Sequence, residues 1–420
     1  FVVPQKLKFF FKKFFVLVWT FLLCLQKSVI LENIDFGYAP ATTIGDLVWH
    51  DQNANGIKEI SESGMQNIRI FLLDQLQIKV DSTLTGVDGK YIFDNIPANT
   101  YALQFVIPAG YFPTCRLNGN MPGNSKIDET GITSFYSFTS GSPADSIDAG
   151  FVAFGSVKGL MFDDLNVNGY YDSGENLLSQ KTVELSGMTT CGQSVQASIQ
   201  TNVNGEYHFP SVKPGNYSLK FNLDQGFIPS LFPVENVWSN KMTSDSLISN
   251  LQLGSGQTLV GQNAGVYRRA EISGRVWEDK NVNSLQESDE VGIKEIAIIL
   301  RGTDALSQSV ELTTTTDTDG SYSFSDLIPG NYNLEMTAGN NFTFSPFRIE
   351  QDTTVDNNSN NGLTEDITLL SGKNYKSVDF GIFYFSSLGD KVWHDLNGNG
   401  IQETDAVSYT HLTLPTSDLV

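Results

Sequence analysis

IGDLVWHDQNANGIKEISE, residues 44–62, joins a strand pattern to a loop pattern in one short stretch. Its first half is predicted to be a β-strand, in which Val48 and His50 lie on the opposite face from Trp49, so the aromatic residue is expected in the core. In its second half, a twelve-residue loop carries oxygen-bearing side chains at positions 1, 3, 5, 9 and 12: Asp51, Asn53, Asn55, Glu59 and Glu62. Gly56 permits a sharp turn at position 6, and Ile57 offers its backbone carbonyl at position 7. This is the ligand order of a calcium-binding loop.

The loop pattern recurs three more times, beginning at Asp164, Asp279 and Asp395, which gives a period of about 115 residues. The chain is therefore predicted to be a tandem repeat. The fourth loop has Ala406 at position 12 and is not predicted to bind metal. In the third loop, Ser284 replaces the glycine and is expected to strain the turn. The predicted ligands, including the position-7 carbonyls, are Asp164, Asn166, Asn168, Tyr170, Asp172 and Glu175 in the second loop and Asp279, Asn281, Asn283, Leu285, Glu287 and Glu290 in the third.

Two further blocks recur with the same period. The block at 85–105, 201–221 and 316–336 places Asp-Gly or Asn-Gly before alternating aromatic residues, which is typical of a tight turn that opens a half-buried strand. A last block closes each unit with Asp-Ala-Gly, Asn-Ala-Gly or Asp-Phe-Gly. About seven short strands per unit, with turn residues at each junction, predict an all-β fold of tandem antiparallel β-sandwiches.

Composition excludes several classes of function. The chain has 26 Lys and Arg against 47 Asp and Glu, a net charge of −21, so we expect no binding to nucleic acid or to anionic membrane surfaces. The four histidines form no cluster, and no Ser-His-Asp, Cys-His or phosphate-loop arrangement recurs. We therefore expect neither enzymatic activity nor a small-molecule substrate.

The three cysteines, Cys24, Cys115 and Cys191, fall in different parts of the chain. No repeat holds two of them, so no disulfide can close inside a domain. We expect metal rather than sulfur to staple the domains, as suits an exported protein that lacks disulfides.

The spacing of these blocks predicts the domain organisation. Lysines precede a short apolar run near the start of the chain, which is the pattern of a signal peptide. The predicted segments are 1–31, a signal peptide-like leader; 32–41, a linker or the end of a preceding repeat; 42–153, 154–268 and 269–385, three repeats; 386–405, the truncated start of a fourth; and 406–420, a tail that resembles a translated sequencing-adapter artefact.

Together, the motifs GD-x-VW-x-D-x-N-x-NG, T-x-x-DG-x-Y-x-F and the DAG or DFG ending resemble the B-type repeat of bacterial serine-aspartate repeat surface proteins, over residues 42–405. The resemblance implies prealbumin-like or immunoglobulin-like β-sandwiches that hold calcium in a secreted or surface-displayed, adhesin-like protein. In this picture the tandem array is a stalk or spacer. A host or neighbouring-cell protein or glycan would be bound by regions outside this fragment.

The loops have a simpler interpretation, because Asn at alternate positions also suits Asx turns that hydrogen-bond to themselves. Acids at both positions 9 and 12, in three copies, favour calcium. Unlike EF-hand loops, which lie between helices, these loops follow strands. Neutral Asn at positions 3 and 5 leaves about three anionic ligands, so we expect a dissociation constant of roughly 10⁻⁴–10⁻³ M, as in extracellular modules.

A second metal site could draw on the polar run that precedes the closing block of the third repeat, with Asp356, Asn358 and Asn360. The first repeat offers Asn124 and Asp128 at a comparable point, with different spacing. A flexible polar loop explains these residues equally well.

A covalent alternative is an intramolecular isopeptide bond between Lys158 and Asn263 in the second repeat, of the kind that related B-type and pilin domains form. The other repeats lack this pair. The sequence therefore predicts a calcium-stabilised structural stalk or spacer. The alternative function is an extracellular protein- or carbohydrate-binding module that uses the sandwich loops.

Overall fold

A computed structural model of the chain describes residues 40–117, 122–141, 146–230, 241–337, 341–347, 355–385, 392–395, 397–402, 404 and 408–409. The predicted leader and nearly all of the 32–41 segment and the 406–420 tail lie outside the described residues. Every regular element in the described part is a β-strand, so the predicted all-β class is confirmed. Over the same residues, no helix is long and apolar enough to cross a membrane.

The described residues divide into two compact units. The first comprises the residues up to His50 together with 56–109 and 116–151. The second comprises 51–55, 110–115 and everything from Val152 onward.

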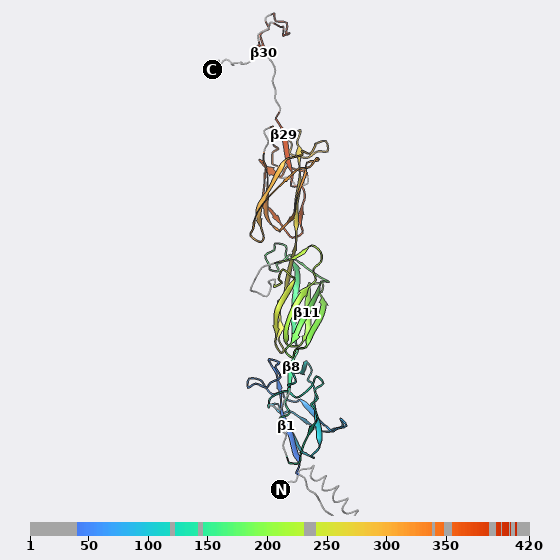
Figure 1. Cartoon of the computed structure of the whole chain (residues 1–420). Coiled ribbons are helices and arrows are strands. Elements are labelled where there is room, and N and C mark those ends of the chain that lie inside the picture. Colours follow the sequence, from blue (N-terminus) through green and yellow to red (C-terminus); the bar gives the residue numbers. More distant parts are fainter. Residues whose placement is uncertain are drawn as a thin grey trace, which may run out of the picture. The chain divides into compact units, whose positions relative to one another are not determined.

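Two sheets form the first repeat, with strand orders β4-β1-β8-β6 and β3-β2-β5-β7. Figure 1 labels β1 and β8 of this repeat. Burial alternates along most of β4, which places one face of this strand inside, whereas Tyr101, Ala102 and Leu103 of β5 are all buried. The strands are β1 (Thr42–His50), β2 (Arg69–Leu73), β3 (Lys79–Leu84), β4 (Lys90–Ile96), β5 (Thr100–Phe105), β6 (Tyr111–Pro113), β7 (Tyr136–Ser137) and β8 (Ala149–Ala153).

The second repeat is built in the same way, from sheets β10-β9-β18-β15 and β12-β11-β14-β16, with β13 and β17 also paired to β9. Its strands are β9 (Gly155–Asp163), β10 (Asn176–Leu177), β11 (Thr182–Thr189), β12 (Ser194–Gln200), β13 (Glu206–Val212), β14 (Gly215–Phe221), β15 (Phe227–Pro229), β16 (Leu247–Leu253), β17 (Thr258–Leu259) and β18 (Ala264–Arg268).

In the third repeat the sheets are β22-β19-β29-β24, with β28 also on β19, and β21-β20-β23-β26-β25, with β27 also on β23. Beyond it, β30 (Val392–Trp393) pairs with β31 (Ser408–Tyr409). The strands of the repeat are β19 (Ala270–Glu278), β20 (Ala297–Asp304), β21 (Ser309–Thr315), β22 (Ser321–Leu327), β23 (Gly330–Met336), β24 (Phe342–Phe344), β25 (Ser359–Asn360), β26 (Leu363–Thr364), β27 (Ile367–Leu369), β28 (Asn374–Tyr375) and β29 (Phe380–Tyr384).

The first and last strands of each repeat pair in parallel, which the prediction of antiparallel sandwiches did not include. These pairs are β1 with β8, β9 with β18 and β19 with β29, whereas most other pairs are antiparallel. Parallel pairing needs a long connection between its strands, and here the whole repeat provides it. The chain therefore enters each sandwich at one end and leaves it at the other.

Both sheets of a repeat contribute to one core. The ring of Tyr207 on β13 meets that of Phe221 on β14 edge to face, with centroids 5.8 Å apart, and Tyr91 and Phe105 make the same contact at 5.6 Å in the first repeat. Trp49 and Trp277 are fully buried, as their place in the strand pattern predicts. Burial of such side chains stabilises each sandwich by about 1.5–3 kcal/mol per residue.

The predicted tight turns are present, and their glycines press against the first strand. Gly89 has a φ of 81°, and a Cβ there would lie 2.3 Å from the carbonyl oxygen of Val48. Gly320 has a φ of 84° and the same close approach to Val276 O. Neither the dihedral angle nor the space admits a side chain, which explains the Asp-Gly pattern.

The expectation that the protein lacks disulfides is wrong. Cys115 and Cys191 form a disulfide, with Cα atoms 5.3 Å apart. The prediction that no disulfide closes inside a repeat holds, because this bond joins a residue of the first repeat to a residue of the second. The count of cysteines within each repeat could not reveal this pairing, because the link lies between two repeats.

A buried tyrosine hydroxyl latches the closing segment of each repeat to the strand after the tight turn. Tyr207 Oη donates to the carbonyl of Gln262, and Tyr91 Oη donates to Ile147 O at 2.6 Å. Burial raises the pKa of Tyr207 well above its ordinary value, so the hydroxyl stays a donor. The aromatic ring fills the core while its polar end fixes the backbone.

We expect Tyr207→Phe to lower the free energy of unfolding of the second repeat by about 1–3 kcal/mol, because it leaves the buried Gln262 carbonyl without its donor. Denaturant titration measures the loss. Tyr384→Phe is the matched control, since this side chain is 44% exposed, and its effect should stay within about 0.5 kcal/mol. Equal effects of the two substitutions would contradict the latch.

Candidate metal-binding loops

The second loop begins where β9 ends, and its first acid is taken into the sandwich. Asp164 is fully buried. Its Oδ1 accepts the N–H of Asn168 at 3.1 Å, and its Oδ2 accepts that of Gly169 at 2.8 Å. Gly169 has a φ of 80°, which turns the chain so that both N–H groups face the carboxylate. Burial nevertheless raises the pKa of Asp164.

The acid at position 12 closes the loop onto its own start. Glu175 Oε1 accepts the N–H of Leu165 at 2.9 Å, and Oε2 accepts that of Asp172 at 3.0 Å. Burial raises the pKa of Glu175 to about 7, and the neighbouring charges of Asp164 and Asp172 act in the same direction. Negative charge is thus crowded into a poorly solvated place.

The asparagines at positions 3 and 5 face the acid at position 9. Asn166 Nδ2 and Asn168 Nδ2 donate to Asp172 Oδ2, at 3.1 and 2.6 Å. The Asn168 Oδ1 accepts the N–H of Tyr170 at 2.7 Å. The Asx-turn hydrogen bonds of the simpler interpretation are therefore present, alongside the acids that favour calcium.

The third loop repeats this hydrogen-bond pattern. Asp279 is fully buried and accepts the N–H groups of Asn283 and Ser284, at 3.1 and 2.9 Å. Glu290 accepts those of Lys280 and Glu287, at 2.8 and 3.0 Å, and burial raises the pKa of Glu290. Ser284 has a φ of 66°, so a serine occupies the left-handed region in which the second loop has glycine, as the sequence suggested.

The oxygens of these loops fit a hard cation better than a soft one. Glu287 Oε2 is enclosed and has no hydrogen-bond partner among the described residues, although Oε1 accepts from Asn283 Nδ2. No group of three or more His, Cys, Asp or Glu side chains in the described ranges is arranged to hold a metal ion. A cation would therefore also need amide and main-chain oxygens, which suit calcium.

The local hydrogen bonds within the first half of the first loop, and those within its second half, match those of the other two loops. Asn55 N donates to Asp51 Oδ1 at 3.3 Å and to Asn53 Oδ1 at 3.1 Å, and Glu59 N donates to Glu62 Oε2 at 3.1 Å. In the fourth loop, which was not predicted to bind metal, backbone N–H groups bond to Asp395, and Glu403 lies outside the described residues.

The prediction missed a hydroxyl that supports the first acid of a loop. Thr114 Oγ1 donates to Asp51 Oδ2, and a hydrogen bond from Ser230 lowers the pKa of Asp164 against the effect of burial. Both hydroxyls follow a short strand, β6 or β15, by one residue. YFPT and FIPS stand at equivalent places in the first two repeats, which marks the position of the hydroxyl but not its contact with the acid.

The suggested second site lies beside the third loop. Asp356 is 1% exposed and forms a backbone bridge with Leu285, and its Oδ1 accepts from Asn358 Nδ2 at 3.2 Å. Asn360 lies exposed on β25. Asp356 and Asn358 are therefore grouped at the loop, whereas Asn360 is not placed among them.

In the first repeat, Asn124 forms a backbone bridge with Ile57 of the first loop. Asp128 instead caps its own turn, accepting the N–H groups of Thr130 and Ile132. Asp128 therefore has the contacts of a turn residue.

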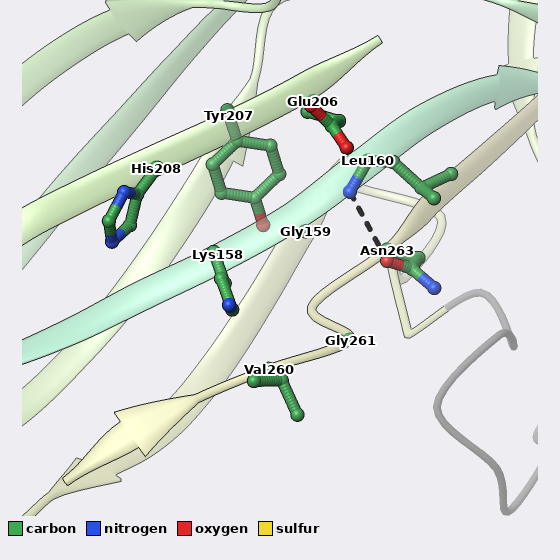
Figure 2. A pocket seen from close by; sticks show the side chains of 9 residues that line it. All are labelled: Lys158, Gly159, Leu160, Glu206, Tyr207, His208, Val260, Gly261 and Asn263. Carbon is green, nitrogen blue, oxygen red and sulfur yellow. Dashed lines mark hydrogen bonds between the residues drawn. The ribbon is translucent and has the colours of Figure 1, made fainter. Parts of the chain in front are cut away.

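Lys158 and Asn263 line one pocket of about 510 Å³ (Figure 2). Lys158 is exposed, whereas Asn263 is buried and its Oδ1 accepts the N–H of Leu160 at 3.2 Å. In the third repeat, Asp379 accepts the N–H of Arg275 in the same way, at 2.7 Å. Asn263 thus has a structural contact that does not depend on an isopeptide bond.

Asp379 is the charged counterpart of Asn263, and burial raises its pKa to about 7, with the nearby charge of Asp356 acting in the same direction. The folded state then holds a proton that the unfolded chain releases near pH 4, so stability falls as pH rises from about 4 to about 7. Asp379→Asn keeps the acceptor and removes the charge.

We expect Asp379→Asn to reduce this loss, which is at most about 1.4 kcal/mol per pH unit, and to make the third repeat more stable than the wild type above pH 7. Denaturant midpoints between pH 4 and 8, in chelator, measure it. Asn263→Asp is the reciprocal control and should introduce the same pH dependence into the second repeat. Parallel pH profiles for all three proteins would refute the assignment.

The sequence model of one protein family, described as SdrD B-like domain, matches residues 42–151, 155–266 and 270–382. Serine-aspartate repeat-containing protein D of Staphylococcus aureus (strain Newman) is 29% identical over 385 residues, covering 89% of this chain and 28% of that protein. Serine-aspartate repeat-containing protein F of Staphylococcus epidermidis (strain ATCC 12228 / FDA PCI 1200) is 28% identical over 386 residues, covering 87% of this chain and 22% of that protein.

The chain thus spans less than a third of the length of these relatives. Among solved structures, that of BcpA, the major pilin subunit of Bacillus cereus, is similar with a TM-score of 0.33 and 12% identity, covering 83% of this chain and 100% of that chain. A likeness at that level adds nothing to the assignment. The three family matches cover most of the chain and confirm the resemblance of its motifs, so the chain belongs to the SdrD B-like domain family.

Proposed function

We propose that this chain is a calcium-stabilised spacer in a surface-displayed bacterial protein. Three matches to the SdrD B-like domain family, and relatives named as serine-aspartate repeat-containing proteins, support the structural role. The chain spans less than a third of the length of these relatives. Our proposal assigns recognition of a protein or glycan to regions of the whole molecule outside these repeats.

The spacer role follows from how the chain passes through each repeat. Parallel pairing of first and last strands carries the chain from one end of a sandwich to the other. One residue, Phe154, separates β8 from β9, and one residue, Arg269, separates β18 from β19. Connections this short leave little slack between consecutive repeats.

The calcium part of the proposal is carried by one observation: two loops, beginning at Asp164 and Asp279, bury acids at positions 1 and 12 with the same hydrogen bonds. The predicted ligands of each loop would supply carboxylate, amide and main-chain oxygens to the ion. Bound calcium would offset the buried negative charge in a chain of net charge −21. It would also add stability by binding the folded state alone.

We expect millimolar calcium to raise the thermal unfolding temperature of the chain relative to chelator, by an amount equivalent to about 1.4 kcal/mol per site at tenfold excess over the dissociation constant. The combined Glu62→Gln, Glu175→Gln and Glu290→Gln variant should lose most of this gain, because it removes the position-12 charge from every complete loop.

Glu365→Gln is the control, since Glu365 is exposed and far in sequence from the loops, and it should respond to calcium like the wild type. Magnesium, which demands octahedral geometry, should stabilise less. Identical melting curves in calcium and in chelator would reject the calcium proposal and leave the loops as Asx turns, with the spacer role untouched.

A further inference from the structure

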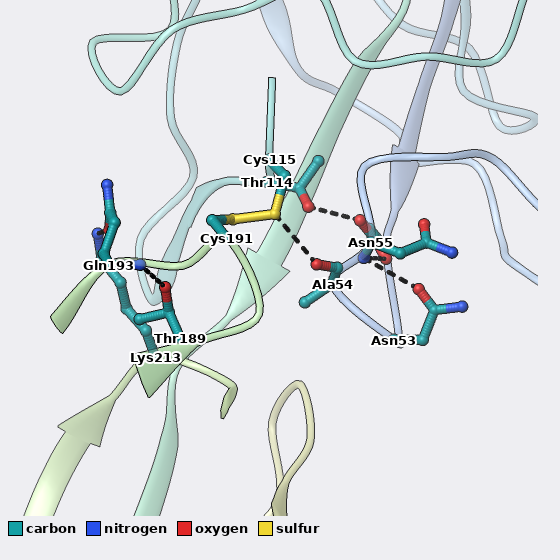
Figure 3. Close-up of a disulfide and its surroundings, with 10 residues drawn as sticks. Asn53, Ala54, Asn55, Thr114, Cys115, Thr189, Cys191, Gln193 and Lys213 are labelled. Atoms are coloured by element: carbon teal, nitrogen blue, oxygen red, sulfur yellow. Dashed lines mark hydrogen bonds between the residues drawn. A yellow bond between two sulfur atoms is a disulfide. The ribbon is translucent and has the colours of Figure 1, made fainter. Parts of the chain in front are cut away.

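The disulfide between Cys115 and Cys191 lies where the first repeat meets the second, among segments ordered by hydrogen bonds (Figure 3). Cys115 follows β6 by two residues and Cys191 lies in the turn between β11 and β12. The turn is fixed by hydrogen bonds from Thr189 N to Gln193 O, at 2.9 Å, and from Gln193 N to Thr189 Oγ1, at 3.1 Å. Neither cysteine is on a loose segment.

Other contacts within the second compact unit lie around the residue that connects the two repeats. Phe154, the connecting residue, donates its N–H to Gly110 O at 3.1 Å, and its ring lies 4.7 Å from that of Phe112. Lys213 Nζ lies 5.2 Å from the ring of Phe112 on the other side of the junction. These contacts surround the disulfide and are made by residues other than the two cysteines.

The loop of the first repeat contacts the disulfide directly. Cys115 Sγ lies 3.3 Å from the carbonyl oxygen of Ala54, and the preceding residue, Thr114, donates to Asp51. Cys115 is therefore held on both sides, by the loop residue Ala54 and by Cys191.

We propose that this disulfide is a covalent bypass that carries tension past the first junction. The cysteines are 76 positions apart, so 75 residues lie in the closed loop between them. That loop contains β7, β8, β9, β10 and β11. Because strands of both repeats lie inside it, neither repeat can be drawn out completely while the bond is intact.

Formation of the bond is a balanced thiol–disulfide exchange. Two cysteine thiols lose two protons and two electrons, and a disulfide-bearing oxidoreductase, or a small disulfide such as oxidised glutathione, is reduced to two thiols. The thiolate of one cysteine attacks the donor disulfide, and the other then displaces the thiol of the donor. An exported protein meets such oxidants.

The second junction offers an internal comparison, because it has no cysteine. Polar contacts hold it instead: Asp163 is 2% exposed, its Oδ2 lies 3.0 Å from Arg268 Nη2, and its Oδ1 accepts from Ser371 Oγ at 2.7 Å. Ser371 N also donates to Leu165 O at 2.9 Å. A reductant should therefore change the first junction and leave the second unaffected.

Single-molecule stretching of the full chain, attached at its two ends, tests the proposal. Oxidised protein should release a contour length that is shorter by about 260 Å than reduced protein, because 75 residues at about 3.5 Å each stay behind the bond. The length released by the third repeat should be the same in both. Equal total lengths with and without reductant would overturn the bypass.

Two controls keep this result interpretable. The Cys115→Ser, Cys191→Ser double variant should give the longer extension even without reductant, and separate unfolding steps of its first and second repeats report that both have folded. Peptide mapping without reduction should find Cys115 joined to Cys191. Free thiols at both positions, or a bond from either to Cys24, would reject the proposal.

Discussion

The hydrogen bond from the first residue of a loop to the last strand of its repeat constrains everything around it. Asp164 N donates to Val266 O at 2.8 Å, and Asp279 N donates to Ile382 O at 2.7 Å. Each bond extends the parallel ladder by one residue, so the chain turns away only after its carboxylate is inside the sandwich. A buried carboxylate needs donors, and the N–H groups of positions 5 and 6 supply them. Strand pairing and loop shape therefore have one cause.

Local features of the repeat could be predicted from the sequence because they depend on residues close together in the chain. The aromatic residue that recurs in the first strand of each repeat predicted a core position for Trp49, and the Asp-Gly pairs predicted turns that only glycine can make. The parallel partner of the first strand lies a whole repeat away, and a period of two carries no information about it. Nor could the sequence show that Thr114 reaches Asp51, since the two come together only when β6 is in place.

The site was predictable to a similar extent. The order of acids and amides located the loops, and the burial of Asp164, Glu175, Asp279 and Glu290 matches their places at positions 1 and 12. The extent to which burial raises the pKa of each acid depends on the packing of the folded sandwich and could not be predicted from the sequence. Asn263 illustrates the difference. Its sequence context suggested a cross-link, whereas the structure gives it the same backbone contact that Asp379 makes with a charged side chain.

Parallel pairing of the first and last strands also bears on how such a gene can change. All the strand partners of a repeat come from within that repeat, and the chain leaves at the end opposite to its entry. A duplication or deletion of one whole unit therefore leaves each strand of the remaining repeats with the same pairing partners. A change in the number of units would therefore preserve the sheets of each remaining repeat, whereas separation of the first unit from the second would leave Cys115 and Cys191 without each other.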